Sequence, residues 1–152
     1  MDQIDDMDRR ILAVLQGDAT LSVEQIAERV ALSRNACWRR IRLMEDRGVI
    51  RGRVVLADPA KVGCPLQVMV QIRTSSHQAD WLERFQRAVS AMPEVIGAYR
   101  MTGDLDYLLR VRVADMPAYD AFYKRLIGRI PLSDISASFV MEEIKDTTAL
   151  PL

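Results

Sequence analysis

Hydrophobic residues near the start of the chain recur at intervals of three and four, which is the spacing of an amphipathic helix. Three such stretches follow one another, and a polar residue that can cap a helix stands before each of them. The pattern predicts one helix from Asp5 to about Gly17, a short second helix that starts after Leu21, and a third from Ser33 to Arg47. Only a few residues connect the second helix to the third.

The short connection between two capped helices is typical of a helix-turn-helix, whose second helix enters the major groove of DNA. The third helix is therefore the predicted recognition helix. After it, residues 49–56 have the composition of two brief strands around Gly52, as in a β-wing. We predict a winged helix-turn-helix over residues 1–57, followed by a linker over residues 58–64.

From residue 65 the hydrophobic period changes to two, because Leu66, Val68 and Val70 alternate with other side chains. The next elements are predicted to be a helix from Ala79 to Met92, strands over 95–102 and 107–113, a helix capped by Asp115, and a strand from Ile135 to about Glu143. This βαββαβ order predicts a ferredoxin-like antiparallel sheet with both helices on one face. The fold class is thus α+β, and the second domain spans residues 65–152.

The face of the predicted sheet that carries no helices is expected to need a cover. We place Val68, Met69 and Tyr99 on that face, and these side chains are too apolar to be left in water. Packing of two sheets against each other would remove them from water. We therefore expect the chain to form a homodimer.

The composition places the chain among globular proteins without revealing a partner. It has 152 residues, of which 49% are hydrophobic, and its 21 basic and 21 acidic side chains give no net charge. Any argument for nucleic-acid binding must therefore be local. No apolar run is long enough to span a bilayer, and the acidic N-terminus lacks the order of a signal peptide. We expect a cytoplasmic protein that binds no membrane.

Metal-binding and redox chemistry have little support in the sequence. The chain has one histidine, His77, and two cysteines far apart, Cys37 and Cys64, which argues against a zinc site or a disulfide. His77 is expected on a loop, with metal binding or pH sensing as the minor alternative. Cys37 is expected to pack in the third helix with Ile41 and Met44. The neighbouring arginines leave a redox role open, because they would lower the pKa of the thiol.

The local charge is strongly basic around the third helix. Between Ser33 and Leu56 there are seven arginines against Glu45 and Asp46, a net charge of +5. Such a patch in a neutral chain is typical of a DNA-binding surface. A charged, solvated helix face is the alternative, and the helix-turn-helix context favours DNA binding over it.

The predicted DNA-binding residues fall into two groups. Those on the outward surface of the third helix can read base edges, since arginine pairs with guanine and asparagine with adenine. They are Arg34, Asn35, Trp38, Arg39 and Arg42. Those at helix ends and in the wing are suited to phosphates, and they are Ser22, Ser33, Arg51 and Arg53. Trp38 can equally contact the groove or pack on a neighbouring element.

Several segments together resemble the Lrp/AsnC, or feast/famine, transcription regulators over essentially the whole chain. The segments are Ile4-Asp5 with Asp8 and Ile11-Leu12, Leu32-Ser33, Arg40-Ile41 followed by Met44-Glu45 and Gly48-Val49-Ile50, and Gly103 with Asp104 and Asp106. The resemblance implies an amino-acid-sensing C-terminal domain of the RAM/ACT-like type, and dimers that assemble into octamers or similar rings. It also implies a double-stranded, pseudo-palindromic operator and a nucleoid-associated protein. Arg34-Asn35-Ala36 departs from the threonines and proline common in close relatives, which leaves the operator sequence open.

By the same resemblance, an amino-acid effector binds between dimers near the turn that joins the two middle strands. The residues that match this site are Tyr99, Met101, Thr102, Gly103, Asp104 and Asp106. A glycine permits close backbone approach, turn amides can bind a carboxylate, and Asp104 or Asp106 can pair with an α-ammonium group. The alternative is that these residues only form the turn.

The function predicted from these features is that of a DNA-binding transcription regulator that responds to an amino acid and uses no other cofactor. We expect no catalytic residues, no metal ligands and no enzyme activity, because the sequence lacks a Ser-His-Asp set and a glycine-rich phosphate loop. One alternative is an architectural protein that packages DNA without an effector. A less favoured one is a regulatory subunit of an amino-acid-metabolising enzyme. The identity of the effector and the choice between activation and repression stay open.

Overall fold

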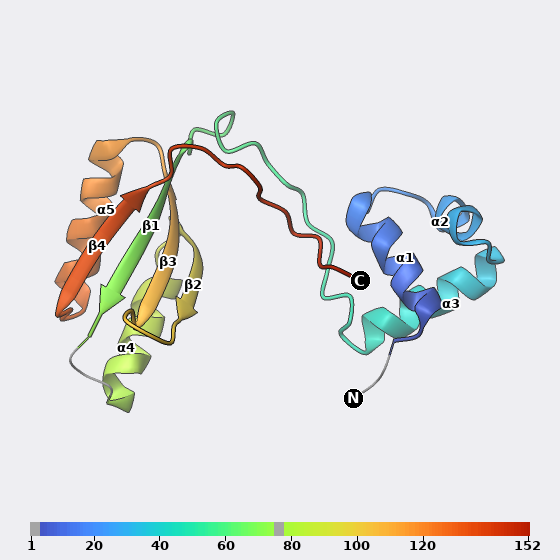
Figure 1. Cartoon of the computed structure of the whole chain (residues 1–152), viewed down its shortest axis with the longest axis horizontal. Coiled ribbons are helices and arrows are strands. Elements are labelled where there is room, and N and C mark those ends of the chain that lie inside the picture. The colour runs from blue at the N-terminus through green and yellow to red at the C-terminus, as the bar shows by residue number, and fades with distance from the viewer. Residues whose placement is uncertain (1–3, 75–77) are drawn as a thin grey trace. The chain divides into compact units, whose positions relative to one another are not determined.

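The computed structural model of the chain describes residues 4–74 and 78–152 (Figure 1). The chain forms two compact units, one made of residues 4–55 together with Ile144–Leu152 and the other of Leu56–Glu143. In the described residues, no helix has both the length and the apolar character needed to cross a lipid bilayer. His77, which we expected on a loop, lies outside the described residues.

The first unit contains the three predicted helices. They are α1 (Asp6–Gly17), α2 (Val23–Val30) and α3 (Arg34–Asp46). The side chains of Asp5, Ser22 and Ser33 cap them by accepting a hydrogen bond from a backbone N–H of the first turn. One apolar cluster joins the helices, and its buried residues are Ile11, Ile26, Ala27, Val30, Cys37, Ile41 and Met44. The cluster fixes which side of α3 faces solvent.

The turn between α2 and α3 depends on one residue in a left-handed conformation. Ala31 has a φ of 58°, and no other non-glycine residue among those described has a positive φ. Its N–H donates to the carbonyl of Glu28, while the N–H of Leu32 donates to the carbonyl of Ala27 at 2.9 Å. These bonds end α2 within one residue and leave α3 to begin almost at once.

The two wing strands predicted around Gly52 are not formed. No residue from 49 to 65 belongs to a strand, and Val55 is 94% exposed. The backbone N–H groups of Val49 and Ile50 instead donate to the carbonyl of Met44, at 2.9 and 3.1 Å, and close the end of α3. A two-stranded hairpin this short buries too little apolar surface to be stable without a neighbour.

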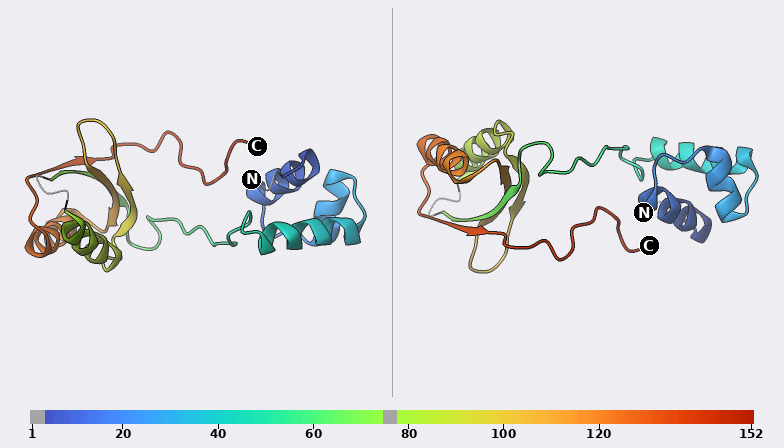
Figure 2. Two further views of the ribbon diagram at one scale, coloured as in Figure 1. Left: turned by 90° about the horizontal axis from the view of Figure 1, so that it is seen from below. Right: turned by 90° about the horizontal axis from the view of Figure 1, so that it is seen from above.

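The second unit has the predicted βαββαβ order. Its elements are β1 (Leu66–Arg73), α4 (Ala79–Ser90), β2 (Val95–Arg100), β3 (Tyr107–Val113), α5 (Met116–Arg129) and β4 (Asp134–Phe139). The strands lie in the order β2-β3-β1-β4, and all three pairs are antiparallel. Figure 2 shows α4 and α5 side by side on one face of the sheet. The ferredoxin-like prediction is confirmed.

The placement of Val68 on the open face of the sheet was wrong. Val68 is fully buried in the core beneath the helices, and Val70 and Ile72 lie on the same face as Val68. Since successive strand residues point to opposite faces, Met69 lies on the open face, as predicted. The open face is more polar than expected, because Gln67, Gln71, Arg110 and Arg112 alternate with the core residues of β1 and β3.

Strand β4 ends earlier than predicted, at Phe139 instead of Glu143. The N–H of Val140 still donates to the carbonyl of Gln67 at 3.0 Å. The neighbouring strand begins at Leu66, and the residue before it, Pro65, has no N–H to continue the ladder. The chain therefore leaves the sheet after Val140.

The last residues of the chain, Ile144–Leu152, belong to the helical unit. The side-chain amide of Gln16, at the end of α1, pairs with the backbone of Leu150. Its Oε1 accepts from the N–H of Leu150 at 2.7 Å, and its Nε2 donates to the carbonyl of Leu150 at 3.1 Å. The Gln16 amide thus donates one hydrogen bond to the backbone of Leu150 and accepts one from it, as a residue of a neighbouring strand would. The second domain predicted from sequence, residues 65–152, includes this segment.

Candidate DNA-binding and effector sites

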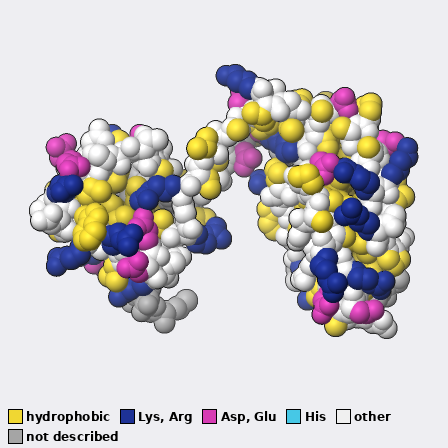
Figure 3. All heavy atoms as spheres, turned by 180° about the vertical axis from the view of Figure 1, so that it is seen from behind, with side chains coloured by type: hydrophobic (Ala, Val, Ile, Leu, Met, Phe, Trp, Pro, Cys, Tyr) yellow, Lys and Arg dark blue, Asp and Glu magenta, His cyan; other side chains and the backbone are white. Residues whose placement is uncertain are grey.

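The candidate DNA-binding surface is the side of α3 opposite its buried residues. Helical periodicity directs Cys37, Ile41 and Met44 into the core. The five side chains assigned to base reading are all exposed, and they are Arg34, Asn35, Trp38, Arg39 and Arg42. Figure 3 shows basic side chains among hydrophobic ones at the molecular surface. The structure therefore brings these five residues together on one surface.

The back of α3 is fixed to α1 by an arginine that faces away from this surface. Arg40 Nη1 lies 2.7 Å from Asp5 Oδ2 and 2.8 Å from Asp8 Oδ1. The pKa of the Asp5 carboxyl is lowered, first by the backbone N–H of Asp8 and then by the Arg40 guanidinium. Both carboxylates belong to the capping box of α1. Arg40 was counted within the basic patch, but its role is to position the helix.

Three arginines of the proposed surface already have acidic partners. Arg34 forms an ion pair with Glu24, and Arg42 and Arg53 reach Glu45 at 3.4 and 3.0 Å. Arg39, by contrast, has no ion pair with any residue that the structure describes. Binding to a phosphate or a base requires the paired arginines to leave their carboxylates, which lowers the net gain. Arg39 is free of this cost.

Trp38 is 54% exposed on α3. An indole that packed fully on a neighbouring helix or on the wing would be largely buried. Packing thus accounts for less than half of its surface, and the remainder is open to a partner.

Two of the predicted phosphate contacts lie at helix N-termini. Ser22 Oγ accepts from the N–H of Gln25 and Ser33 Oγ accepts from the N–H of Ala36, both at 3.3 Å. The Ser33 hydroxyl still has its proton to donate to a phosphate oxygen, whereas the Ser22 hydroxyl already bonds the Glu24 carboxylate. Arg51 and Arg53, the other two predicted contacts, lie on the exposed segment that follows α3.

Cys37 is fully buried in the helical core. Its burial raises the pKa of the thiol, which is the opposite of what the neighbouring arginines would do. The thiolate is the reactive form of cysteine. The structure therefore supports packing and gives no support to the redox alternative.

The turn between β2 and β3 contains the residues predicted to bind an effector. Gly103 has a φ of 95°, a conformation that side chains disfavour. The N–H of Met101 donates to the carbonyl of Asp106 at 2.9 Å and closes the turn. Asp106 Oδ2 accepts from the N–H of Thr74 at 2.8 Å, so one of its oxygens is occupied. Asp104 is exposed. Arg73 Nε donates to its backbone carbonyl at 2.9 Å, and its carboxylate has no hydrogen bond or ion pair with a residue that the structure describes.

Tyr99 is on β2, but its ring does not point to the turn. A Cβ atom built on Gly97 would lie 2.7 Å from the Tyr99 hydroxyl. The ring therefore folds back over Gly97, toward the start of the strand. The structure brings Met101, Thr102, Gly103, Asp104 and Asp106 together and leaves the Tyr99 hydroxyl apart from them.

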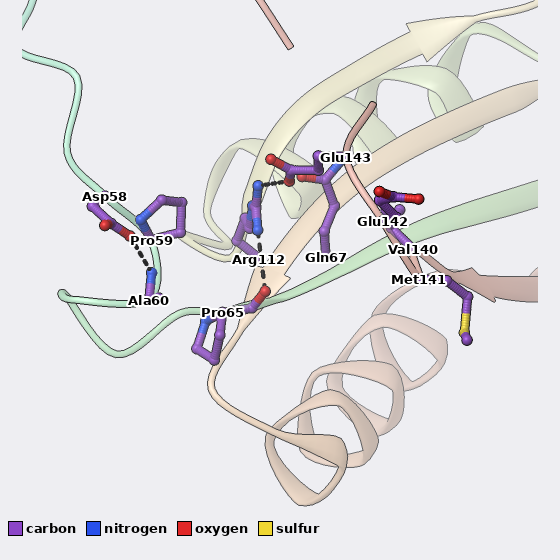
Figure 4. A pocket seen from close by; sticks show the side chains of 10 residues that line it. All are labelled: Asp58, Pro59, Ala60, Pro65, Gln67, Arg112, Val140, Met141, Glu142 and Glu143. Atoms are coloured by element: carbon purple, nitrogen blue, oxygen red, sulfur yellow. Dashed lines mark hydrogen bonds and ion pairs between the residues drawn. The ribbon is translucent and has the colours of Figure 1, made fainter. Parts of the chain in front are cut away.

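Two of the cavities formed by the described residues lie in the second unit, and neither is lined by residues 101–106. One, of about 250 Å³, lies between α4 and β2 and includes Tyr99 and Tyr107. The other, of about 260 Å³, lies where β1 begins and where β3 and β4 end (Figure 4). Sequence reasoning missed this second cavity, since its lining comes from segments far apart in the chain.

Comparisons with known proteins agree with both halves of the chain. Residues 4–51 match a family model described as winged helix-turn-helix DNA-binding. Residues 67–150 match a family model described as the Lrp/AsnC ligand binding domain.

The similar proteins cover nearly the whole chain. It is 50% identical to the DNA-binding transcriptional activator DecR of Escherichia coli (strain K12), over 98% of this chain and 99% of that protein. A crystal structure of an AsnC family transcriptional regulator from Agrobacterium tumefaciens has 56% sequence identity and a TM-score of 0.94, covering 97% of each chain. A transcriptional regulator of Neisseria meningitidis in complex with L-Met has 37% identity and a TM-score of 0.93, covering 98% of this chain and 97% of that one.

Proposed function

Because the chain belongs to the Lrp/AsnC family of DNA-binding transcription regulators, we propose that it reads its operator with the exposed surface of α3 and senses an amino acid at the turn between β2 and β3. The observation that carries the first part is the exposure of five polar or aromatic side chains opposite the buried face of α3. The second part rests on the left-handed Gly103 and the exposed Asp104.

On DNA, α3 enters the major groove and Arg39 and Asn35 contact base edges. Ser22, Ser33 and Arg51 contact phosphates and fix the register of the helix. Arg34 and Arg42 also contact base edges, and Arg53 contacts a phosphate, once each arginine has left its carboxylate partner. This division assigns specificity to Asn35 and Arg39 on the exposed side of α3 and affinity to the helix ends and the segment after α3.

In the effector site, backbone N–H groups around Gly103 bind the α-carboxylate. Asp104 binds the α-ammonium group, since its carboxylate makes no hydrogen bond or ion pair with a described residue. Asp106 holds the turn to β1 through Thr74. L-Met is the first effector to test, because the Neisseria meningitidis relative was solved with it.

The assembly that we propose is a homodimer formed through the open face of the sheet, with dimers joining into an octamer. Met69, Leu108 and Tyr99 supply the apolar part of the interface between the polar side chains of β1 and β3. A second dimer near the turn completes the effector site. A pseudo-palindromic operator matches the symmetry of such a dimer, and the protein acts on the bacterial nucleoid in the cytoplasm.

The experiment that tests the proposal is binding of the full chain to DNA with and without an amino acid. Duplexes selected from a random pool are compared with scrambled duplexes at equal salt, which separates specific binding from packaging. Thermal unfolding with each amino acid in turn identifies the effector, since a ligand at a hundred times its Kd adds about 2.7 kcal/mol.

We expect one or a few amino acids to raise the Tm and to change operator affinity, and Asp104→Ala to abolish both effects. Glu83→Ala, an equal charge change on α4, should abolish neither. Equal affinity for selected and scrambled duplexes would refute sequence-specific regulation. No response to any amino acid would refute sensing.

A further inference from the structure

The cavity between α4 and β2 lies on the face of the sheet that the helices cover, opposite the proposed dimer interface. Ala98 of β2 pairs with Leu109, a core residue, so its side chain faces the helices, and Arg100, two residues on, faces the same way. Among the lining residues only Tyr99 belongs, by this alternation, to the open face. The lining includes Leu82, Phe85 and Val89 of α4, Ala98 and Arg100 of β2, and Tyr107 of β3.

A small residue leaves this space open. Ala98 is exposed, although Leu109, its neighbour across the strands, is fully buried. Alanine adds a single methyl group to the layer between strand and helix, where a longer side chain would occupy the cavity. The resulting volume is about 250 Å³, below the range of about 300–1,000 Å³ that is common for drug-sized ligands. A ligand that fits it is therefore small.

Two polar side chains of the lining, on neighbouring strands, have no partner among the described residues. Arg100 is exposed and makes no ion pair or hydrogen bond there. Tyr107 is only 6% exposed, with its ring against those of Trp81 and Phe85, yet its hydroxyl makes no hydrogen bond to a described residue. A buried tyrosine usually has a partner for its hydroxyl. Since Arg100 and Tyr107 are paired across the strands, one ligand group can contact both side chains.

The charge of the lining is positive. Arg100 is the one ionised side chain among the described residues that line the cavity. The acidic residues of α4, Asp80 and Glu83, pair with Arg84 and Arg87 and are not part of the lining. A guanidinium binds a carboxylate through two parallel hydrogen bonds. A positive charge beside apolar walls therefore favours an organic carboxylate.

We propose that this cavity binds a short aliphatic monocarboxylate without an ammonium group, of the size of 4-methylpentanoate. The carboxylate accepts hydrogen bonds from the Arg100 guanidinium and the Tyr107 hydroxyl. The branched chain lies against Leu82, Phe85 and Val89, which form the apolar wall. An α-ammonium group would lose water there without gaining a carboxylate partner, so the cavity discriminates against amino acids. The site is independent of the proposed effector site.

The test is a ¹⁹F NMR titration of the full chain, labelled with 5-fluorotryptophan, with sodium 4-methylpentanoate. Trp81 reports on the cavity, because its ring stacks on that of Phe85 with the centroids 5.2 Å apart. Trp38 lies in the helical unit and serves as an internal control, and Trp38→Phe assigns the two resonances. We expect a saturable shift of the Trp81 resonance while the Trp38 resonance stays unchanged.

Three related compounds at equal ionic strength separate the features of the ligand. Sodium acetate has the carboxylate without the chain, 4-methylpentan-1-ol has the chain without the charge, and leucine adds an α-ammonium group to 4-methylpentanoate. All titrations are repeated in Asp104→Ala, which disables the proposed effector site. In that variant we expect an unchanged Kd for 4-methylpentanoate and a Kd at least about tenfold higher for each of the other three compounds, as for the loss of a hydrogen bond to a charged group.

Three variants separate the charge, the hydroxyl and the space. Arg100→Gln should weaken binding of 4-methylpentanoate at least about tenfold, whereas Arg84→Gln, the same change on α4 outside the cavity, should not. Tyr107→Phe keeps the ring and removes the hydroxyl, so it should weaken binding in a folded protein. Ala98→Leu fills the cavity and should abolish binding without lowering the Tm, since the added side chain gains apolar contacts. A loss of binding through unfolding would lower the Tm.

Four outcomes would overturn the proposal. The first is the absence of a saturable Trp81 shift in the unmodified protein. The second is an equal Kd for 4-methylpentan-1-ol, which would show apolar partitioning without recognition of an anion. The third is unchanged binding in Arg100→Gln or in Ala98→Leu, which would place the ligand elsewhere. The fourth is a loss of binding in Asp104→Ala, which would place the ligand at the effector turn.

Discussion

Arg40 Nη1 lies 2.8 Å from Asp8 Oδ1, and this contact joins the recognition helix to the first turn of α1. The same nitrogen reaches the N-cap residue Asp5. The guanidinium of Arg40 on α3 therefore binds both carboxylates of the capping box of α1. We expect Arg40→Ala to lower the free energy of unfolding of the helical unit by about 1 kcal/mol, in line with partly exposed ion pairs. Arg47→Ala, on an exposed residue without an ion pair to a described residue, should have a negligible effect.

This loss can be measured unit by unit with fluorotryptophan. The chain has two tryptophans, Trp38 in the helical unit and Trp81 in the sheet unit. Urea unfolding followed by ¹⁹F NMR reads both resonances in one sample. The prediction fails if Arg40→Ala shifts the Trp81 transition and leaves that of Trp38 unchanged.

The same contact predicts a pH dependence of stability. The folded-state pKa of Asp5 is below its ordinary value near 3.8. A lowered carboxyl pKa contributes stability that is present above the unfolded-state value and is lost as the pH falls through the folded-state value. The helical unit should therefore lose stability as the pH falls below about 3.8, and Asp5→Asn should make this dependence shallower. Asp6→Asn, which removes a carboxylate without a hydrogen bond to a described residue, tests whether the effect is specific to the cap.

The left-handed turn residue predicts a stabilising substitution. A side chain in the left-handed region costs about 1–2 kcal/mol that glycine avoids, although glycine also loses more backbone entropy on folding. Ala31→Gly is expected to raise the stability of the helical unit by about 0.5–1 kcal/mol. Ala13→Gly in the interior of α1 should lower it by about 1 kcal/mol. A loss of stability in Ala31→Gly, measured by urea unfolding, would disprove the strain at this turn.

The ion pairs of α3 predict a ranking of arginine substitutions on DNA binding. Arg39→Ala should weaken operator binding by about 1–3 kcal/mol if it reads a base. Arg42→Ala should weaken it less, because Arg42 must first leave Glu45. Arg84→Ala, on α4, is the charge-matched control. Fluorescence anisotropy on a labelled duplex measures all three, and equal affinities for Arg39→Ala and Arg84→Ala would remove Arg39 from the recognition surface.

Asp104 and Asp106, the two aspartates of the turn, should have different roles, one in effector binding and the other in stability. Asp106→Ala removes the acceptor for the N–H of Thr74 and should lower the stability of the sheet unit by about 1–3 kcal/mol. Asp104→Ala should leave stability unchanged and abolish the Tm response to the effector. Thermal unfolding of both variants with and without the effector distinguishes the roles. The assignment is wrong if Asp104→Ala is the destabilising variant.

Local signals were sufficient for the helices and for the strand order. The capping boxes at Asp5 and Ser22 involve residues three positions apart, so the sequence contains both partners. The wing could not be predicted in the same way. Residues 49–56 have the composition of strands, but the described structure gives them no strand to pair with. The N–H groups of Val49 and Ile50 instead bond to the carbonyl of Met44 at the end of α3. Val68 and Met69 are consecutive residues of β1, so they cannot lie on the same face, and it is Val68 that lies in the core.

The candidate site could be predicted only where it lies on one element. The exposed face of α3 follows from helical periodicity alone, as does the burial of Cys37. The ion pairs of Arg34 and Arg53 do not follow, because each partner lies on another segment. The burial of Gln67 depends on contacts distant in sequence, since residues 140–143 line the same cavity. In the strand pattern it reads as an ordinary solvent-facing amide.

The pairing of Gln16 with Leu150 gives the chain the topology of an insertion. The helical unit is discontinuous in sequence, because residues 56–143, which form the other unit, lie between its two segments. A fragment that stops at the first domain boundary therefore lacks a segment that the intact protein supplies from the far end. A tag fused after Leu152 is likewise attached close to the end of α1, where Gln16 binds Leu150. Domain dissection of this chain should keep residues 144–152 with the helices, by circular permutation or by co-expression of the two segments.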